Sequence, residues 1–119
     1  MVLKHFKIAE FDSPDLPGSG SKMQPKLLQM LDNARALAGV PFSITSGYRT
    51  EAHNKKVGGV ADSSHCQGWA ADIAASSGTS KWAIVDGCIK AGFNRIGIAN
   101  GFIHVDCDPT KPAKVIWTY

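Results

Sequence analysis

Two histidines and one aspartate, His65, Asp72 and His104, are the residues whose types best suit a chemical role. Their surroundings predict buried strands for Asp72 and His104. A buried imidazole or carboxylate is costly unless it is hydrogen-bonded, paired with a charge or bound to a metal. Zinc accepts imidazole nitrogen and carboxylate oxygen, and catalytic zinc sites typically use three protein ligands and leave a fourth position for water. The three residues therefore fit a catalytic zinc site, with hydrogen-bonded structural residues as the alternative.

The spacing of His65 and Asp72 limits how they can meet. Because they are seven residues apart, they would face opposite sides of one continuous strand. His65 must therefore approach from a loop, the glycine-bearing segment 57–64, and Gly68 supplies the flexible backbone that allows this approach. Spacing alone leaves both the metal site and the structural alternative open.

The segment 63–73 resembles the signature Ser-x-His-x-x-Gly-x-Ala-x-Asp of zinc D-alanyl-D-alanine carboxypeptidases and related phage endolysin peptidases. Two further features stand in the family's order: an upstream Ser-Gly-Tyr-Arg at 46–49 and a downstream strand histidine within 102–106. Together they span roughly residues 42–107. The resemblance implies an α+β fold of the hedgehog type, a small antiparallel sheet with flanking helices. It also implies that His65, Asp72 and His104 are the zinc ligands.

The chemistry that the resemblance implies is hydrolysis. Zinc lowers the pKa of a bound water to about 7 and polarises the carbonyl that is attacked. Arg49 is a candidate catalytic and substrate-binding residue, because a guanidinium can donate two parallel hydrogen bonds to a carboxylate or an oxyanion. A surface ion pair is its alternative. Ser46 and Tyr48 are candidate substrate-binding residues beside it, although a turn and a packing role would suffice for both.

The general base is harder to assign, because the sequence departs here from much of the family. Many relatives carry Glu or Asp three residues before the last histidine ligand, where this chain has Gly101. Asp106 is the candidate catalytic base, since it follows His104 on the same strand face; support of a histidine ligand is its alternative role. His53 is a further candidate, with a solvated or structurally bonded histidine as the alternative.

Three helices are predicted around these residues. Apolar residues recur at three- and four-residue steps over 23–38, and Gly39 ends that helix. The predicted helices and their caps are 23–38 with Ser21 or Gln24, 51–56 with Thr50, and 81–91 with Thr79 or Ser80. The segment 8–22 is rich in proline and glycine and predicts an ordered surface loop.

Five strands are predicted, among them a half-buried one at 42–45 that alternates apolar and polar residues, a buried one at 69–74 and an edge strand at 115–117. They are predicted at 42–45, 69–74, 96–98, 102–106 and 115–117. Asn100-Gly101 predicts a tight hairpin turn with positive φ at both residues. In the strand that follows, Phe102, His104 and Asp106 share one face, so that the histidine and the second carboxylate lie side by side.

Size and composition bound the remaining possibilities. The 119 residues predict one domain over 1–119, and we expect a monomer. The net charge is +3 with the basic residues spread along the chain, which does not favour nucleic-acid binding. A solvated surface explains that charge as well as attraction to an anionic cell wall does. No segment approaches the roughly 20 apolar residues of a membrane span.

The cysteines and the N-terminus bear on where the protein is made. Cys66, Cys88 and Cys107 are odd in number and form no close pair, so we interpret them as small packing residues rather than disulfide partners or zinc ligands. The first residues lack the apolar run of a secretory signal. We therefore expect synthesis in the cytoplasm without a signal peptide.

The leading hypothesis is a zinc metallopeptidase that cuts peptidoglycan stem peptides or cross-links, as a carboxypeptidase or an endopeptidase. Its lack of a signal suits an endolysin of phage or prophage origin that reaches the wall after release. The rival hypothesis is a non-catalytic module on the same fold, with or without zinc, that binds wall peptides or a partner; Gly101 supports it. A purely structural polar core is the third.

Overall fold

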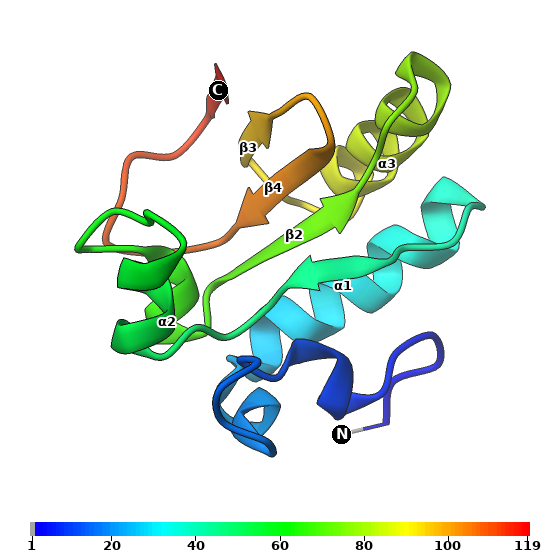
Figure 1. Cartoon of the computed structure of the whole chain (residues 1–119). Helices are drawn as coiled ribbons and strands as arrows, with labels where there is room; N and C mark the ends of the chain where they lie inside the picture. Colours follow the sequence, from blue (N-terminus) through cyan, green and yellow to red (C-terminus); the bar gives the residue numbers. More distant parts are fainter. Residues whose placement is uncertain (1) are drawn as a thin grey trace.

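A five-stranded sheet forms the centre of the molecule in this computed structural model, which describes residues 2–119 (Figure 1). Its strands are β1 (Ile44–Ser46), β2 (Ala70–Ala74), β3 (Arg95–Ile98), β4 (Phe102–Asp106) and β5 (Val115–Thr118). Their order across the sheet is β1-β2-β4-β3-β5. The pairs β1–β2, β2–β4 and β4–β3 are antiparallel, whereas β5 runs parallel to β3. The predicted α+β class is confirmed, and the parallel edge makes the sheet mixed instead of wholly antiparallel.

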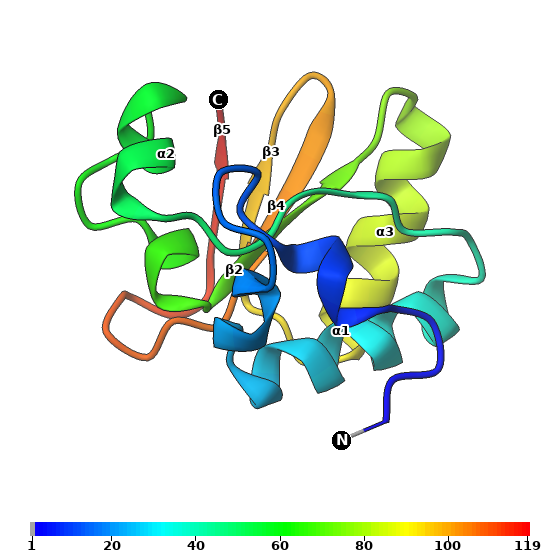
Figure 2. The same ribbon diagram turned by 60° about the horizontal axis from the view of Figure 1, so that its bottom comes forward.

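The helices lie on both sides of the strands. They are α1 (Pro25–Ala38), α2 (Glu51–Lys56) and α3 (Gly78–Lys90), with 3₁₀ turns η1 (Ile8–Phe11), η2 (Ser19–Lys22) and η3 (Ser64–Gln67). Figure 2 shows α1 and α3 together on one side of the sheet and α2 beyond the other. Within residues 2–119, none of the helices combines the length and the apolar character needed to cross a membrane.

The ends of the helices follow local chemistry. Pro25 occupies the first position of α1, two residues after the predicted start of this helix. Gly39 ends the helix with φ of 69°, and the hydroxyl of Thr50 accepts a hydrogen bond from the His53 N–H at the start of α2, both as predicted. The prediction for α3 was wrong at its start. Ser77 caps it, and the hydroxyls of Ser77 and Ser80 bond each other's backbone N–H.

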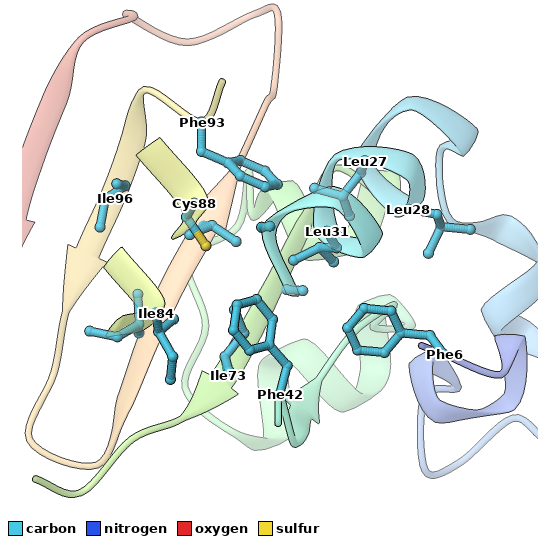
Figure 3. Close-up of a cluster of buried hydrophobic side chains, with 14 of the residues drawn as sticks. Phe6, Leu27, Leu28, Leu31, Phe42, Ile73, Ile84, Cys88, Phe93 and Ile96 are labelled. Carbon is cyan, nitrogen blue, oxygen red and sulfur yellow. The ribbon is translucent and has the colours of Figure 1, made fainter. Parts of the chain in front are cut away.

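The hydrophobic core fills the space between the sheet and the pair α1 and α3. Alternate strand residues such as Ile73, Ile103 and Val105 are fully buried there. They meet apolar residues of the helices and of the loop after α3, among them Leu27, Leu31, Ile84, Cys88 and Phe93 (Figure 3). Because side chains alternate along a strand, the residues between them face the opposite side of the sheet, where the polar residues gather.

Two loops differ from the sequence-based expectations. The β3–β4 hairpin forms, but neither Asn100 nor Gly101 has a positive φ. Ile98 and Ile103 are the last pair of the ladder, and beyond them the Ala99 N–H donates to the Phe102 carbonyl oxygen across Asn100-Gly101, so the turn closes without left-handed backbone. The segment 8–22 is not only surface, since Phe11 is fully buried in the core.

The contact between α1 and α3 yields a test of this packing. A Cβ on Gly87 would lie 2.7 Å from both the Ala34 carbonyl oxygen and the Ala38 Cβ. We expect Gly87→Val to force the helices apart and to lower the free energy of unfolding by about 2 kcal/mol, measured by chemical denaturation. Gly78→Val is the control, because a Cβ there meets nothing within 4 Å. Equal losses in both variants would contradict the prediction.

Candidate functional site

Three donor atoms from distant parts of the chain meet on the polar face of the sheet. They belong to His65 on η3, Asp72 on β2 and His104 on β4, and all lie within 4.8 Å of one another. Asp72 and His104 are paired across the β2–β4 ladder. Asp72 Oδ1 lies 3.2 Å from His65 Nε2 and 2.9 Å from His104 Nδ1. The structure therefore brings together the three residues that the sequence predicted as metal ligands.

The turn η3 places His65 beside the sheet. Ser63 caps this turn by accepting a hydrogen bond from the His65 N–H, and the Arg49 N–H donates to the His65 carbonyl. Gly68 ends it with φ of 75°, and a Cβ there would lie 2.5 Å from the Lys22 carbonyl oxygen. Only glycine fits both this backbone conformation and this close approach. The expected loop delivery of His65 is thus achieved by a short 3₁₀ turn closed by a glycine.

The hydrogen-bond partners of the two imidazoles leave the centre of the group short of positive charge. His65 Nδ1 lies 2.8 Å from the Gly47 carbonyl oxygen, which can only accept, so this nitrogen carries the proton. In a neutral ring, Nε2 then presents a lone pair to the carboxylate of Asp72. His104 lies between two carboxylates, with Nε2 at 2.8 Å from Asp106 Oδ2. A neutral imidazole has one N–H, so either extra protons or a metal cation must supply the missing charge.

The pKa shifts of Asp72 and His104 arise from the same contacts between imidazoles and carboxylates. Burial raises the pKa of Asp72, but its contacts with the His104 and His65 imidazoles more than offset burial, so that its pKa lies well below the usual range. Burial lowers the pKa of His104, yet hydrogen bonds to Asp106 and Asp72 outweigh burial and the net pKa is raised. Two nitrogens and one carboxylate oxygen are a donor set that zinc accepts. The residues present therefore fit a zinc ion held between them.

Asp106 is engaged on the far side of the His104 ring. Its Oδ2 faces His104 Nε2, while its Oδ1 accepts hydrogen bonds from Arg95 Nε at 2.6 Å and from the Asp108 N–H at 3.2 Å. The side chain is 1% exposed. A carboxylate on the second nitrogen of a metal-binding histidine fixes the orientation and the tautomer of that ring. Of the two roles that the sequence left open for Asp106, the contacts favour support of His104.

Arg49 is similarly engaged by its neighbours. It donates to Ser46 Oγ at 2.9 Å, Asn54 Oδ1 at 3.2 Å and Asp72 Oδ2 at 3.3 Å. Since a guanidinium has five N–H groups, two remain for a ligand in the cleft. Arg49 thus holds the outer oxygen of Asp72, which leaves Oδ1 directed at the two imidazoles.

Tyr48 lies apart from this group. It packs against the hydrophobic core, and Lys22 Nζ lies 5.6 Å from the centroid of its ring. It is not among the residues that line the cleft, whereas Ser46 is. The packing alternative describes Tyr48, and its substrate-binding role stays a prediction.

An open cleft of about 710 Å³ gives access to the three donor residues. Its walls include Arg49 and His53 on one side and the aromatic residues Phe102, Trp117 and Tyr119 on β4 and at the C-terminal end. Sequence reasoning missed Asn54, Arg95, Trp117 and Tyr119 as site residues. The apolar segment 115–117 was predicted as a strand, but nothing in the sequence said that it would pair with β3.

Comparison with known proteins identifies the family. A search of curated proteins finds no match for this chain. The family model described as Peptidase M15 matches residues 4–106, which include all three donor residues, Arg49 and Asp106. Peptidases of this family are zinc-dependent, in agreement with the donor set on the sheet. The chain therefore belongs to the peptidase M15 family.

Proposed function

We propose that the protein is a zinc peptidase that hydrolyses peptide bonds of peptidoglycan stem peptides or cross-links. The ligands in this proposal are His65 through Nε2, Asp72 through Oδ1 and His104 through Nδ1. The observation that carries it is the convergence of these three atoms, with the second nitrogen of each imidazole already bonded to an acceptor. That pattern is typical of metal-binding histidines, whose other nitrogen is held by a carbonyl or a carboxylate.

The substrate assignment is supported by the sequence and by the cleft. The segment 63–73 resembles the signature of D-alanyl-D-alanine carboxypeptidases and endolysin peptidases, which act on the bacterial wall. The net charge of +3 is compatible with approach to an anionic polymer, although a solvated surface explains it equally well. An open cleft suits a peptide that is part of a larger network, because the chain can enter from the side.

The residues of the chain divide the work in this proposal. Zinc, when bound, polarises the peptide carbonyl and activates a water molecule. Arg49 uses its two remaining N–H groups to hold the developing oxyanion or a substrate carboxylate. Asp106 keeps His104 in the tautomer that offers Nδ1 to the metal. His53 lines the cleft from α2 outside the network around Asp72 and Asp106, so it is the side chain best placed to carry a proton.

The first prediction from this proposal concerns metal and cleavage together. We expect about one zinc per chain in the purified protein, and new stem-peptide fragments when it is incubated with muropeptides and analysed by mass spectrometry. A chelator and His65→Ala should each abolish both the metal and the fragments. His5→Ala is the matched control, because His5 is exposed and far from the donor residues in the sequence.

Two outcomes would oppose this proposal in different ways. Absence of zinc from the wild type after incubation with the metal would contradict the metal site itself. Zinc bound in full beside intact muropeptides would favour the rival function, a zinc-bearing module that binds wall peptides without cutting. Gly101 is the feature that favours this rival, since it stands where many relatives carry an acidic residue.

The second prediction concerns Asp106 as a residue that supports a metal ligand. Asp106→Asn should weaken zinc affinity by about 10- to 100-fold, and activity should return with excess zinc, because the side chain acts through His104. Asp32→Asn controls for the loss of a buried carboxylate elsewhere, since Asp32 is 4% exposed and bonds the backbone N–H groups of Lys4 and His5. Competition with a chromogenic chelator measures the affinity.

The third prediction concerns the proton carrier. His53→Gln should keep the zinc content and lower kcat by about 100-fold or more, the usual contribution of a general acid or base. If Asp106→Asn instead stayed inactive at saturating zinc while His53→Gln stayed active, Asp106 would be the base and the assignment made here would be wrong.

A further inference from the structure

The strand β5 lies beyond the part of the chain that the family model matches, yet it forms one wall of the cleft. The match ends at residue 106, whereas β5 begins at Val115. It pairs with β3 in parallel, with Gly97 opposite Trp117. Because side chains alternate along the strand, Trp117 and then Tyr119 face the cleft, whereas Ile116 faces away from it and is 63% exposed.

Gly97 allows the two aromatic rings to lie directly on the backbone of β3. A Cβ at this position would lie 2.6 Å from Trp117 Nε1 and 2.9 Å from Tyr119 Cε1. The absence of a side chain on Gly97 therefore leaves room for both rings over the sheet. A larger residue here would displace them from the wall of the cleft.

The rings continue the polar face of the sheet into an aromatic surface. The centroid of the Trp117 ring lies 5.4 Å from that of His104, and Arg95 lies 5.3 Å from the Trp117 ring. The Tyr119 ring contacts Phe102 edge-on at 5.1 Å. Trp117 is half-buried by these contacts, but Tyr119 is 69% exposed at the rim. An exposed aromatic ring held in place beside a catalytic cleft is a typical ligand-contacting group.

We infer that Tyr119, held on β3 beside Phe102, is a substrate-contacting residue that binds a small apolar side chain of the peptide next to the bond that is cut. The inference rests on the proposed function. The lining of the cleft supports this role. Arg49 and His53 near α2 can bind backbone and carboxylate groups of a peptide, and the aromatic rings near β5 can contact its methyl groups. D-Alanine residues of stem peptides carry such a methyl group.

The test compares three variants of the full chain. Tyr119→Ala removes the ring, Tyr119→Phe removes only the hydroxyl, and Ile116→Ala removes an exposed side chain from the other face of the same strand. The probe is a synthetic stem peptide that ends in D-alanyl-D-alanine. Its cleavage gives KM and kcat, and its binding to the zinc-depleted protein, measured by calorimetry, gives an affinity that does not depend on catalysis.

We expect Tyr119→Ala to raise KM about tenfold with kcat changed less than threefold, and to weaken binding to the zinc-depleted protein by a similar factor. Tyr119→Phe and Ile116→Ala should stay within about twofold of the wild type. If Tyr119→Ala matched Ile116→Ala in both assays, the inference would be overturned. A wild type that binds the peptide through Tyr119 without cleaving it would uphold the inference and refute the proposed peptidase activity.

Discussion

The contact of one carboxylate oxygen with two imidazoles is the constraint on which the site depends. Asp72 Oδ1 lies within 3.2 Å of His65 Nε2 and within 2.9 Å of His104 Nδ1, and the second nitrogen of each ring is already bonded to an acceptor. Two neutral imidazoles cannot donate to all of these acceptors at once. Additional positive charge at the centre, from a proton or from a metal cation, satisfies these acceptors, and the three donor atoms suit a cation.

The sheet makes this arrangement possible because its two faces have opposite chemistry. On β4, Ile103 and Val105 are fully buried against α1 and α3, which fixes His104 and Asp106 on the opposite face. A slip of one residue in the β2–β4 register would bury the histidine in the hydrophobic core and expose isoleucine to the cleft. The free energy of core packing thus holds the donor atoms of β2 and β4 in place. His65 is the exception, since its position depends on η3 and on the left-handed Gly68.

Local features of the fold could be predicted from the sequence, and long-range pairings could not. The alternation over 102–106 predicted the two faces of β4, and Thr50 as a cap predicted the start of α2, because both depend only on neighbouring residues. The start of α3 was misjudged because Ser77, Thr79 and Ser80 can all cap a helix, and only the geometry of the reciprocal bonds selects Ser77. The ion pair of Arg95 with Asp106 depends on the β3–β4 register, and the place of Trp117 depends on a parallel pairing between distant segments. No local pattern specifies a parallel partner, so these site residues came only from the structure.

The two arginines determine the electrostatics that a metal would meet. Arg49 is paired with Asp72 and Arg95 with Asp106, so each carboxylate of the site is already matched by one guanidinium. With neutral imidazoles, a divalent cation would therefore leave the floor of the cleft with a net positive charge. Such a site stabilises the negative charge that develops on a peptide oxygen during attack, and it also attracts the carboxylate of a peptide end. The pairing with arginine also bears on the choice of general base, because a carboxylate held by an arginine has a lowered pKa and is a weak proton acceptor. Asp106, whose pKa is lowered because hydrogen bonds from His104 and Arg95 outweigh the opposing effect of burial, is for this reason better suited to holding a ligand than to moving a proton.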